Sequence, residues 1–137
     1  MKTSGGKYVA PQPIENEFNT DPYIEMVSVV GDNRKFISAL VTPEFTNVRK
    51  WLADQGETVP EDNKALIEHP KVKALLEERI SQVNQRLARY EQIKKFAVLA
   101  DSFSEQSVEL TPTLKKKRRI IEKKYKDLID QMYPSDL

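Results

Sequence analysis

Apolar residues recur with a helical period in several parts of the chain, most regularly after Pro70. In that stretch the apolar positions are Val72, Leu75, Leu76, Ile80, Val83, Leu87 and Tyr90. A period near 3.6 residues indicates an amphipathic helix, and proline fits a first helical turn because it has no N–H that would need a partner. The pattern predicts a helix of about five turns that begins at Pro70. His69 stands directly before it and is interpreted as a helix-start residue without a catalytic role.

The same period indicates three further helices. The first is short and is expected to begin no earlier than Pro13, because a residue that precedes a proline disfavours helical geometry. Ile14 and Phe18 lie four positions apart and share its apolar face. The other two helices are predicted over residues 45–55 and about 119–132. The polar stretch 57–63 is expected to be a surface connection.

Three runs rich in β-branched and aromatic residues predict strands, over 23–30, 36–42 and 93–100. Five turn-forming residues, 31–35, separate the first two runs, so these runs are expected to form an antiparallel hairpin. The third run could pair with that hairpin. Strands and helices alternate along the chain, which indicates the α+β class: a small three-stranded sheet covered by about four helices.

Length and composition restrict the class of protein. A chain of 137 residues is long enough for one apolar core, so we expect a single domain over 1–137. A hydrophobic fraction of 39% with 31% charged residues is typical of a soluble globular protein. No apolar stretch reaches the roughly 18 residues that a membrane span requires, and the N-terminus lacks the apolar part of a secretory signal. We therefore expect a cytoplasmic protein without a transmembrane segment.

Two residue counts exclude several kinds of site. The chain has no cysteine, which excludes disulfides, thiolate nucleophiles and cysteine-ligated zinc. It has one histidine, His69, which excludes a site with several histidine ligands. We predict no metal site in this chain.

The net charge of +1 conceals a basic cluster over residues 115–126. Such a cluster is either a solvated face or a surface for phosphate groups, and a free-standing nucleic-acid-binding module is one hypothesis for the protein. Two features argue against that hypothesis. The cluster lies on a helix that also carries a complete apolar stripe, and the overall charge is almost balanced.

Two short segments could carry chemistry. In the first, Gly5-Gly6-Lys7-Tyr8, two residues without Cβ allow a ligand or another backbone to approach closely, although glycine pairs are also common in ordinary turns. The second runs from Glu109 through Thr111-Pro112-Thr113 to Lys115. A stiff approach to a lysine would project an ammonium group suited to a phosphate or carboxylate, although a solvated charged face is again the simpler interpretation.

Three blocks of sequence resemble long-chain fatty acyl-CoA synthetases of the adenylate-forming superfamily. They occur in the family's order and span nearly the whole chain, over residues 2–16, 83–96 and 109–118. The first is similar to the loop that follows the hinge, the second to a long helix and the strand after it, and the third to the segment that carries the catalytic lysine. The wider superfamily usually has glutamate in place of Pro13 and glycine in place of Leu114, and both differences resemble the long-chain branch.

The resemblance implies a function that the residues alone do not reveal. It implies a mobile C-terminal domain that works with its own N-terminal adenylation domain on a long-chain fatty acid, ATP with Mg²⁺, and coenzyme A. Lys115 would serve acyl-adenylate formation. The loop of Gly5, Gly6, Lys7 and Tyr8 would line the passage for the pantetheine arm of coenzyme A. Most of the ATP and Mg²⁺ contacts would belong to the N-terminal domain, and no nucleic-acid partner is expected.

The resemblance also implies that the chain is part of a larger ligase and inactive alone. The family's hinge would lie before Lys2, and Met1 would then be an added start. A natural stand-alone relative that acts in trans is the alternative. Membrane association of the full-length enzyme is left open.

Overall fold

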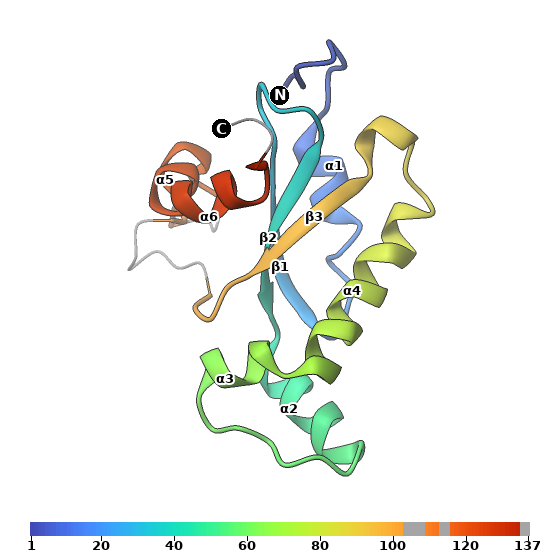
Figure 1. The fold of residues 1–137 in the computed structure, drawn as a ribbon, viewed down its shortest axis with the longest axis vertical. Coiled ribbons are helices and arrows are strands. Elements are labelled where there is room, and N and C mark those ends of the chain that lie inside the picture. The colour runs from blue at the N-terminus through green and yellow to red at the C-terminus, as the bar shows by residue number, and fades with distance from the viewer. Residues whose placement is uncertain (103–108, 113–115, 135–137) are drawn as a thin grey trace.

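A three-layer arrangement organises the protein in the computed structural model, which describes residues 1–102, 109–112 and 116–134. A β-sheet forms the middle layer (Figure 1). Helices α1 (Pro11–Asn16) and α4 (Pro70–Asn84) cover one face, and α5 (Arg118–Lys124) and α6 (Lys126–Gln131) cover the other. Helices α2 (Phe45–Asp54) and α3 (Asn63–Glu68) lie at one end. This architecture confirms the predicted α+β class, with six α-helices in the described ranges instead of about four.

The sheet contains three strands: β1 (Ile24–Val30), β2 (Ile37–Pro43) and β3 (Ile93–Val98). Strands β1 and β2 pair antiparallel, which confirms the predicted hairpin. Strand β3 pairs with β2 in parallel. A parallel pair requires a long crossover, and α2, α3 and α4 supply it.

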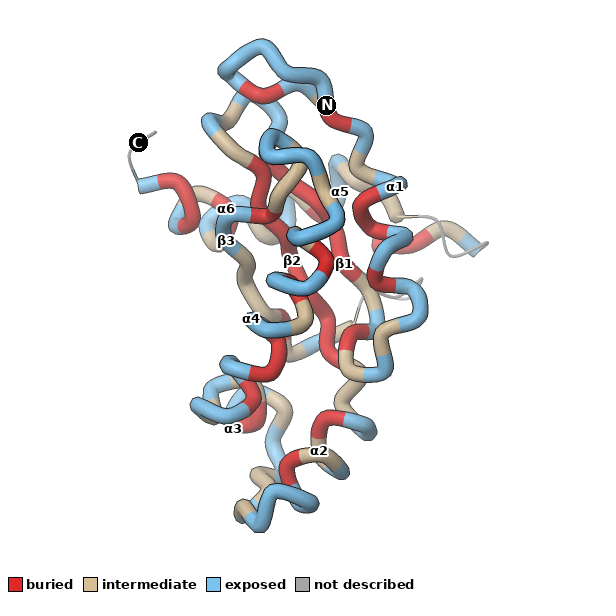
Figure 2. The backbone as a smooth tube through the Cα atoms, turned by 90° about the vertical axis from the view of Figure 1, so that its right-hand side faces the viewer, coloured by how far each residue is buried: buried red, intermediate tan, exposed pale blue. Residues whose placement is uncertain are grey.

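The central strand β2 separates two apolar cores. Ile37, Ala39 and Val41 belong to the core shared with α1 and α4, whereas Leu40 belongs to the core under α5 and α6. Every residue of β2 is buried, as Figure 2 shows along the middle of the molecule. A strand covered on both faces has no solvent-facing side, which explains why its sequence is mainly apolar, with Ser38 and Thr42 as small buried exceptions.

Helix α1 begins earlier than predicted. It starts at Pro11, and the expectation that no helix begins before Pro13 is wrong. The N–H groups of a first helical turn have no intrahelical partner, so both prolines fit there without losing a hydrogen bond.

Helix α4 is shorter than predicted, because it ends at Asn84 and a short 3-10 helix, η1 (Arg89–Glu91), follows. The Asn84 side chain accepts a hydrogen bond from the Ile93 N–H at 2.8 Å and donates one to the Ile93 carbonyl at 2.9 Å. The end of the helix is thereby tied to the start of β3. Leu87 and Tyr90 consequently lie outside the helix that their spacing predicted.

Two other helical boundaries also differ from the prediction. Helix α3 was not expected; Asp62 caps it by accepting a hydrogen bond from the Lys64 N–H. The predicted last helix is divided at Tyr125, whose main chain leaves helical geometry (φ −106°, ψ 23°). His69 confirms its predicted place, since its Nδ1 accepts from the Lys71 N–H at 3.1 Å and caps α4. None of the helices in the described ranges is long and apolar enough to cross a membrane.

Candidate functional site

Residues 2–8 form a tight hairpin whose turn contains the glycine pair, Gly5 and Gly6. Lys2 and Tyr8 pair as an antiparallel bridge. Within it the Thr3 N–H donates to the Lys7 carbonyl at 3.0 Å, and the Gly6 N–H donates to the Thr3 carbonyl, also at 3.0 Å. The structure therefore places all four predicted residues, Gly5 to Tyr8, in one loop.

The two glycines face open space. A Cβ built on Gly5 would have its nearest neighbour, the Thr3 hydroxyl, at 4.0 Å, and one on Gly6 would meet nothing within 4 Å. Gly6 has a φ of +84°, which favours glycine, so its backbone explains its identity. Packing within this chain gives no reason for glycine at position 5.

The exposed aromatic ring of Tyr8 stands beside the glycine pair. Tyr8 is 71% exposed, more than any other large hydrophobic side chain in the described residues. The neighbouring Lys7 ammonium lies over the ring of Tyr90, 5.6 Å from its centroid. The loop thus offers one aromatic face and one cation next to a backbone without side chains.

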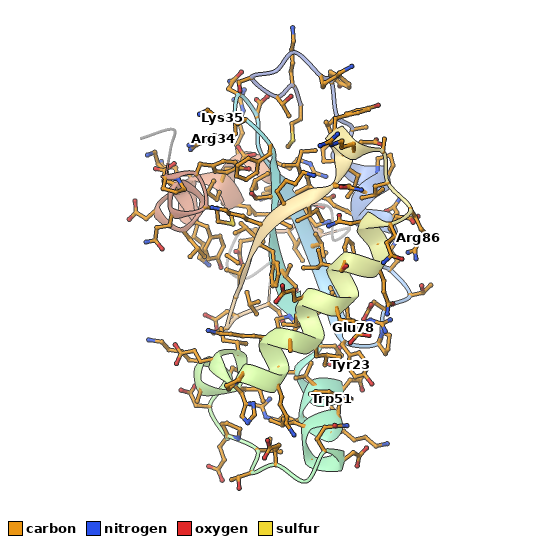
Figure 3. The ribbon with its side chains drawn as sticks, turned by 45° about the vertical axis from the view of Figure 1, so that its right-hand side comes forward. Tyr23, Arg34, Lys35, Trp51, Glu78 and Arg86 are labelled. Atoms are coloured by element: carbon orange, nitrogen blue, oxygen red, sulfur yellow. The ribbon has the colours of Figure 1, made fainter. Side chains whose placement is uncertain are left out.

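The turn between β1 and β2 holds this loop in place. The Ser4 N–H donates to the Arg34 carbonyl at 2.8 Å, and the Asn33 N–H donates to the Lys2 carbonyl at 2.8 Å. Arg34, labelled at this turn in Figure 3, forms an ion pair with Asp130 of α6. The loop is therefore connected through the turn to α6, in the helix layer formed by α5 and α6.

Lys115, the predicted catalytic lysine, lies outside the described residues, but the residues on both sides of its segment are described. Leu110 and Lys116 pair as an antiparallel bridge. The Lys117 N–H donates to the Glu109 carbonyl at 2.8 Å. The stretches of chain before and after the segment, 109–110 and 116–117, are thus hydrogen-bonded to each other.

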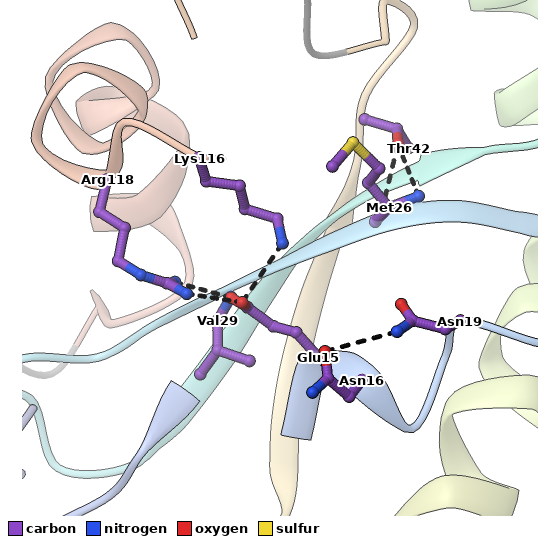
Figure 4. A network of polar contacts seen from close by, with 8 residues as sticks. All are labelled: Glu15, Asn16, Asn19, Met26, Val29, Thr42, Lys116 and Arg118. Atoms are coloured by element: carbon purple, nitrogen blue, oxygen red, sulfur yellow. Dashed lines mark hydrogen bonds and ion pairs between the residues drawn. The ribbon is translucent and has the colours of Figure 1, made fainter. Parts of the chain in front are cut away.

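The buried carboxylate of Glu15 contacts Lys116 and Arg118, which follow the segment (Figure 4). Glu15, on α1, is 4% exposed. Its oxygens accept hydrogen bonds from the Arg118 guanidinium at 2.6 and 2.7 Å and from the Val29 N–H at 2.8 Å, and the Lys116 ammonium lies at 3.3 Å. The hydrogen bond to Glu15 raises the pKa of Arg118, which keeps this guanidinium charged.

A second buried carboxylate, Glu109, belongs to the stretch of chain before the segment. It is 1% exposed, and the Lys124 ammonium lies 3.5 Å from one of its oxygens. Burial, together with the nearby charge of Glu109, raises the pKa of the Tyr125 hydroxyl to about 12. The Tyr125 hydroxyl therefore stays protonated to a higher pH than an ordinary tyrosine.

Pairing with acids uses much of the basic cluster over 115–126. Lys116 and Arg118 contact Glu15, Lys124 faces Glu109, and Lys126 pairs with Asp130 at 2.9 Å. A cavity of about 360 Å³ between the β1–β2 turn and α5 is lined by both signs of charge, among them Arg119, Lys123, Glu122 and Asp32. A surface of mixed sign gives no support to the nucleic-acid hypothesis, in which Lys and Arg would neutralise backbone phosphates.

The model of one protein family matches residues 1–136 of this chain, and its description is "AMP-binding enzyme C-terminal domain". The chain belongs to this family.

Relatives of this AMP-binding enzyme C-terminal domain include fatty-acid ligases. The chain is 34% identical to the long-chain-fatty-acid–CoA ligase FadD15 of Mycobacterium tuberculosis over 131 residues, which cover 96% of the chain and 22% of the relative. It is also 34% identical to the long-chain-fatty-acid–CoA ligase ACSBG1 of Bos taurus, over 96% of the chain and 20% of that protein. The chain thus spans about a fifth of the length of the curated relatives it matches.

Solved structures share the fold of this AMP-binding enzyme C-terminal domain. The adenylation domain of a carboxylate reductase from Mycobacterium chelonae matches 98% of the chain with a TM-score of 0.76 at 22% sequence identity, and the chain covers 19% of that structure. At this identity the likeness supports the fold and no particular chemistry.

Sequence reasoning missed Glu15, which joins the segments of this AMP-binding enzyme C-terminal domain. Its position in the first helix gives no sign of a partner in the basic cluster. Its partners, Lys116 and Arg118, lie more than 100 positions away and were counted as members of a basic cluster. Within the described residues, no group of three or more His, Cys, Asp or Glu side chains is placed to hold a metal ion.

Proposed function

We propose that this chain is the mobile C-terminal domain of an ATP-dependent, AMP-forming long-chain fatty acid–CoA ligase. The observation that carries the proposal is the 34% identity to two long-chain-fatty-acid–CoA ligases over 96% of the chain. Because the chain spans about a fifth of those proteins, the rest of the enzyme would be an N-terminal adenylation domain.

The proposed reaction has two steps. A fatty acid carboxylate attacks the α-phosphorus of ATP, forms the acyl–AMP anhydride and releases pyrophosphate. The thiol of coenzyme A then attacks the acyl carbonyl, loses its proton and displaces AMP, which leaves the acyl thioester. ATP and Mg²⁺ would be bound mainly by the N-terminal domain.

In the first step Lys115 would supply a positive charge between the carboxylate and the α-phosphate. Negative charge gathers on these oxygens as the new bond forms, and a fixed cation there stabilises the transition state by a few kcal/mol. The bridge between Leu110 and Lys116 supports this role, because it fixes the residue next to Lys115 in the chain.

In the second step the loop of Gly5, Gly6, Lys7 and Tyr8 would line the passage of the pantetheine arm. The open space around Gly5 supports this role. Since this domain's own packing does not require glycine there, a requirement for glycine would come from a ligand or a facing domain. The Lys7 ammonium could then face the coenzyme's phosphates.

Each segment has its own anchor, which suits a domain that presents them in turn. The loop over 2–8 is fixed to the β1–β2 turn, and Lys116 and Arg118, which follow Lys115, are fixed to Glu15. A rigid domain with two such segments could deliver them to one active site by rotating between the half-reactions.

The full-length protein that contains this chain tests the proposal directly. With a long-chain fatty acid, ATP, Mg²⁺ and coenzyme A it should form one acyl-CoA and one AMP per turnover, whereas this chain alone should form none. Release of ADP instead of AMP, or ATP cleavage that does not depend on the fatty acid, would contradict the proposal.

A further inference from the structure

We infer that Glu15 is a positioning residue for the adenylation step. It holds Lys116 and Arg118, the residues that come soon after Lys115 in the chain. The inference rests on the proposed role of Lys115. Glu15 itself would not touch substrate, because it is 4% exposed.

The contacts of Glu15 join three parts of the fold. Oε2 accepts from the Val29 N–H of β1 at 2.8 Å and from Nη1 of Arg118 at 2.7 Å. Oε1 accepts from Nη2 of Arg118 at 2.6 Å and from Nζ of Lys116 at 3.3 Å. One carboxylate on α1 thus binds the sheet and both basic residues around Lys117 (Figure 4).

Lys116 is fixed through both its main chain and its side chain. Its main chain pairs with Leu110, and its ammonium, on a side chain that is 15% exposed, contacts Glu15. Lys116 directly follows Lys115 in the sequence. Glu15 therefore helps to fix the position of Lys116, the residue that follows Lys115.

Stability alone does not explain a buried cluster of this kind. A buried ion pair loses solvation, and apolar residues of similar volume often stabilise a fold as well or better. What the cluster adds is direction, since a bidentate guanidinium fixes both distance and angle. A displacement of about 1 Å at a reacting group can lower a rate on the order of 100-fold. A fixed residue next to Lys115 in the chain would therefore matter for catalysis.

Glu15→Gln in the full-length enzyme tests the inference. Glutamine has nearly the same size, but it lacks the charge and turns an amide group toward two cations. We expect the kcat of fatty-acid-dependent ATP–pyrophosphate exchange to fall roughly 10- to 100-fold, with little change in KM for ATP. Thioester formation from supplied acyl-adenylate and coenzyme A should keep the parental rate.

Glu17→Gln is the matched control. It removes the same charge two positions away, where the carboxylate is exposed and pairs with Arg86 at 3.0 Å. Both half-reactions should be unchanged. Glu15→Asp, which keeps the charge on a shorter stem, should recover part of the exchange rate that Glu15→Gln loses.

Arg118→Lys is the second variant, for the case that Glu15→Gln does not fold. It keeps a cation beside Glu15 but cannot bind both oxygens, so a smaller loss confined to pyrophosphate exchange is expected.

The outcomes separate this inference from the proposed function. Absence of exchange in the unmodified enzyme would overturn the proposed function, and the inference with it. If Lys115→Ala lowers exchange while Glu15→Gln, or Arg118→Lys in its place, does not, the inference alone is wrong. An equal loss in both half-reactions would also overturn it, because that result indicates general damage to the domain.

Discussion

Arg118 donates hydrogen bonds to both carboxylate oxygens of Glu15, at 2.6 and 2.7 Å, although the two residues lie 103 positions apart in the chain. The pair joins the first helix to the segment that enters α5. It lies against strand β1, whose Val29 N–H completes the contacts of the carboxylate. The fold thus closes its N-terminal and C-terminal parts on one buried charge.

Removal of this guanidinium should destabilise the fold. Arg118→Ala leaves the buried Glu15 carboxylate with Lys116 as its remaining cation, and we expect the free energy of unfolding in urea to fall by about 2 kcal/mol. Arg86→Ala is the control, because Arg86 pairs with the exposed Glu17 and should cost less than about 0.5 kcal/mol. Equal losses in the two variants would show that the burial of Glu15 has no energetic weight.

Substitution at Gly5 should separate folding from function. Gly5→Ala introduces a Cβ whose nearest neighbour is 4.0 Å away, so the free energy of unfolding should change by less than about 0.5 kcal/mol. If the loop lines the pantetheine passage, the same variant should slow thioester formation and leave acyl-adenylate formation at the parental rate. An unchanged thioester rate, even with a bulkier Gly5→Leu, would contradict the role of this loop.

Gly31 should tolerate substitution much less well than Gly6. A Cβ on Gly31 would lie 2.8 Å from the Phe36 carbonyl oxygen and 3.2 Å from the Tyr133 hydroxyl, which donates to that same oxygen. We expect Gly31→Ala to lower the free energy of unfolding by about 3 kcal/mol. Gly6→Ala, which meets no neighbour and pays only for its positive φ, should cost about 1 kcal/mol.

A surface carboxylate should make part of the stability depend on pH. Hydrogen bonds from Lys126 and Arg34 lower the pKa of Asp130. A carboxyl whose pKa is lower in the folded state stabilises the fold above its ordinary pKa of about 3.9, and this contribution disappears as the pH falls through the lowered value. Asp130→Asn should therefore be less stable than the parent at pH 7, and the difference should shrink below about pH 4 in urea titrations.

The outcome for the fold shows which features are local. The hairpin, the helix that begins at Pro70 and the helix-start role of His69 follow from turn residues, apolar period and proline position, and all were predicted. The parallel pairing of β3, which makes that helix part of a crossover, was not. The end of α4 was not, because Asn84 stops the helix by binding Ile93 of another element. Helix α3 is six residues long, too short to impose a clear period.

The candidate site divides in the same way. The glycine loop and the lysine segment could be proposed from the resemblance, because the residues of each are contiguous. Glu15 could not be chosen from sequence, because its partners follow about 100 residues later and the chain has 21 acidic residues that could have balanced the basic cluster. Only the packing of α1 against β1 brings this carboxylate to Lys116 and Arg118.

The half-reactions of Lys115→Ala in the full-length enzyme test the central claim most directly. Lys117→Ala, which removes the same charge two positions later, is the matched control. The account predicts that Lys115→Ala lowers fatty-acid-dependent ATP–pyrophosphate exchange by at least about 100-fold, while thioester formation from supplied acyl-adenylate stays near the parental rate and Lys117→Ala exchanges normally. Parental exchange in Lys115→Ala would contradict it.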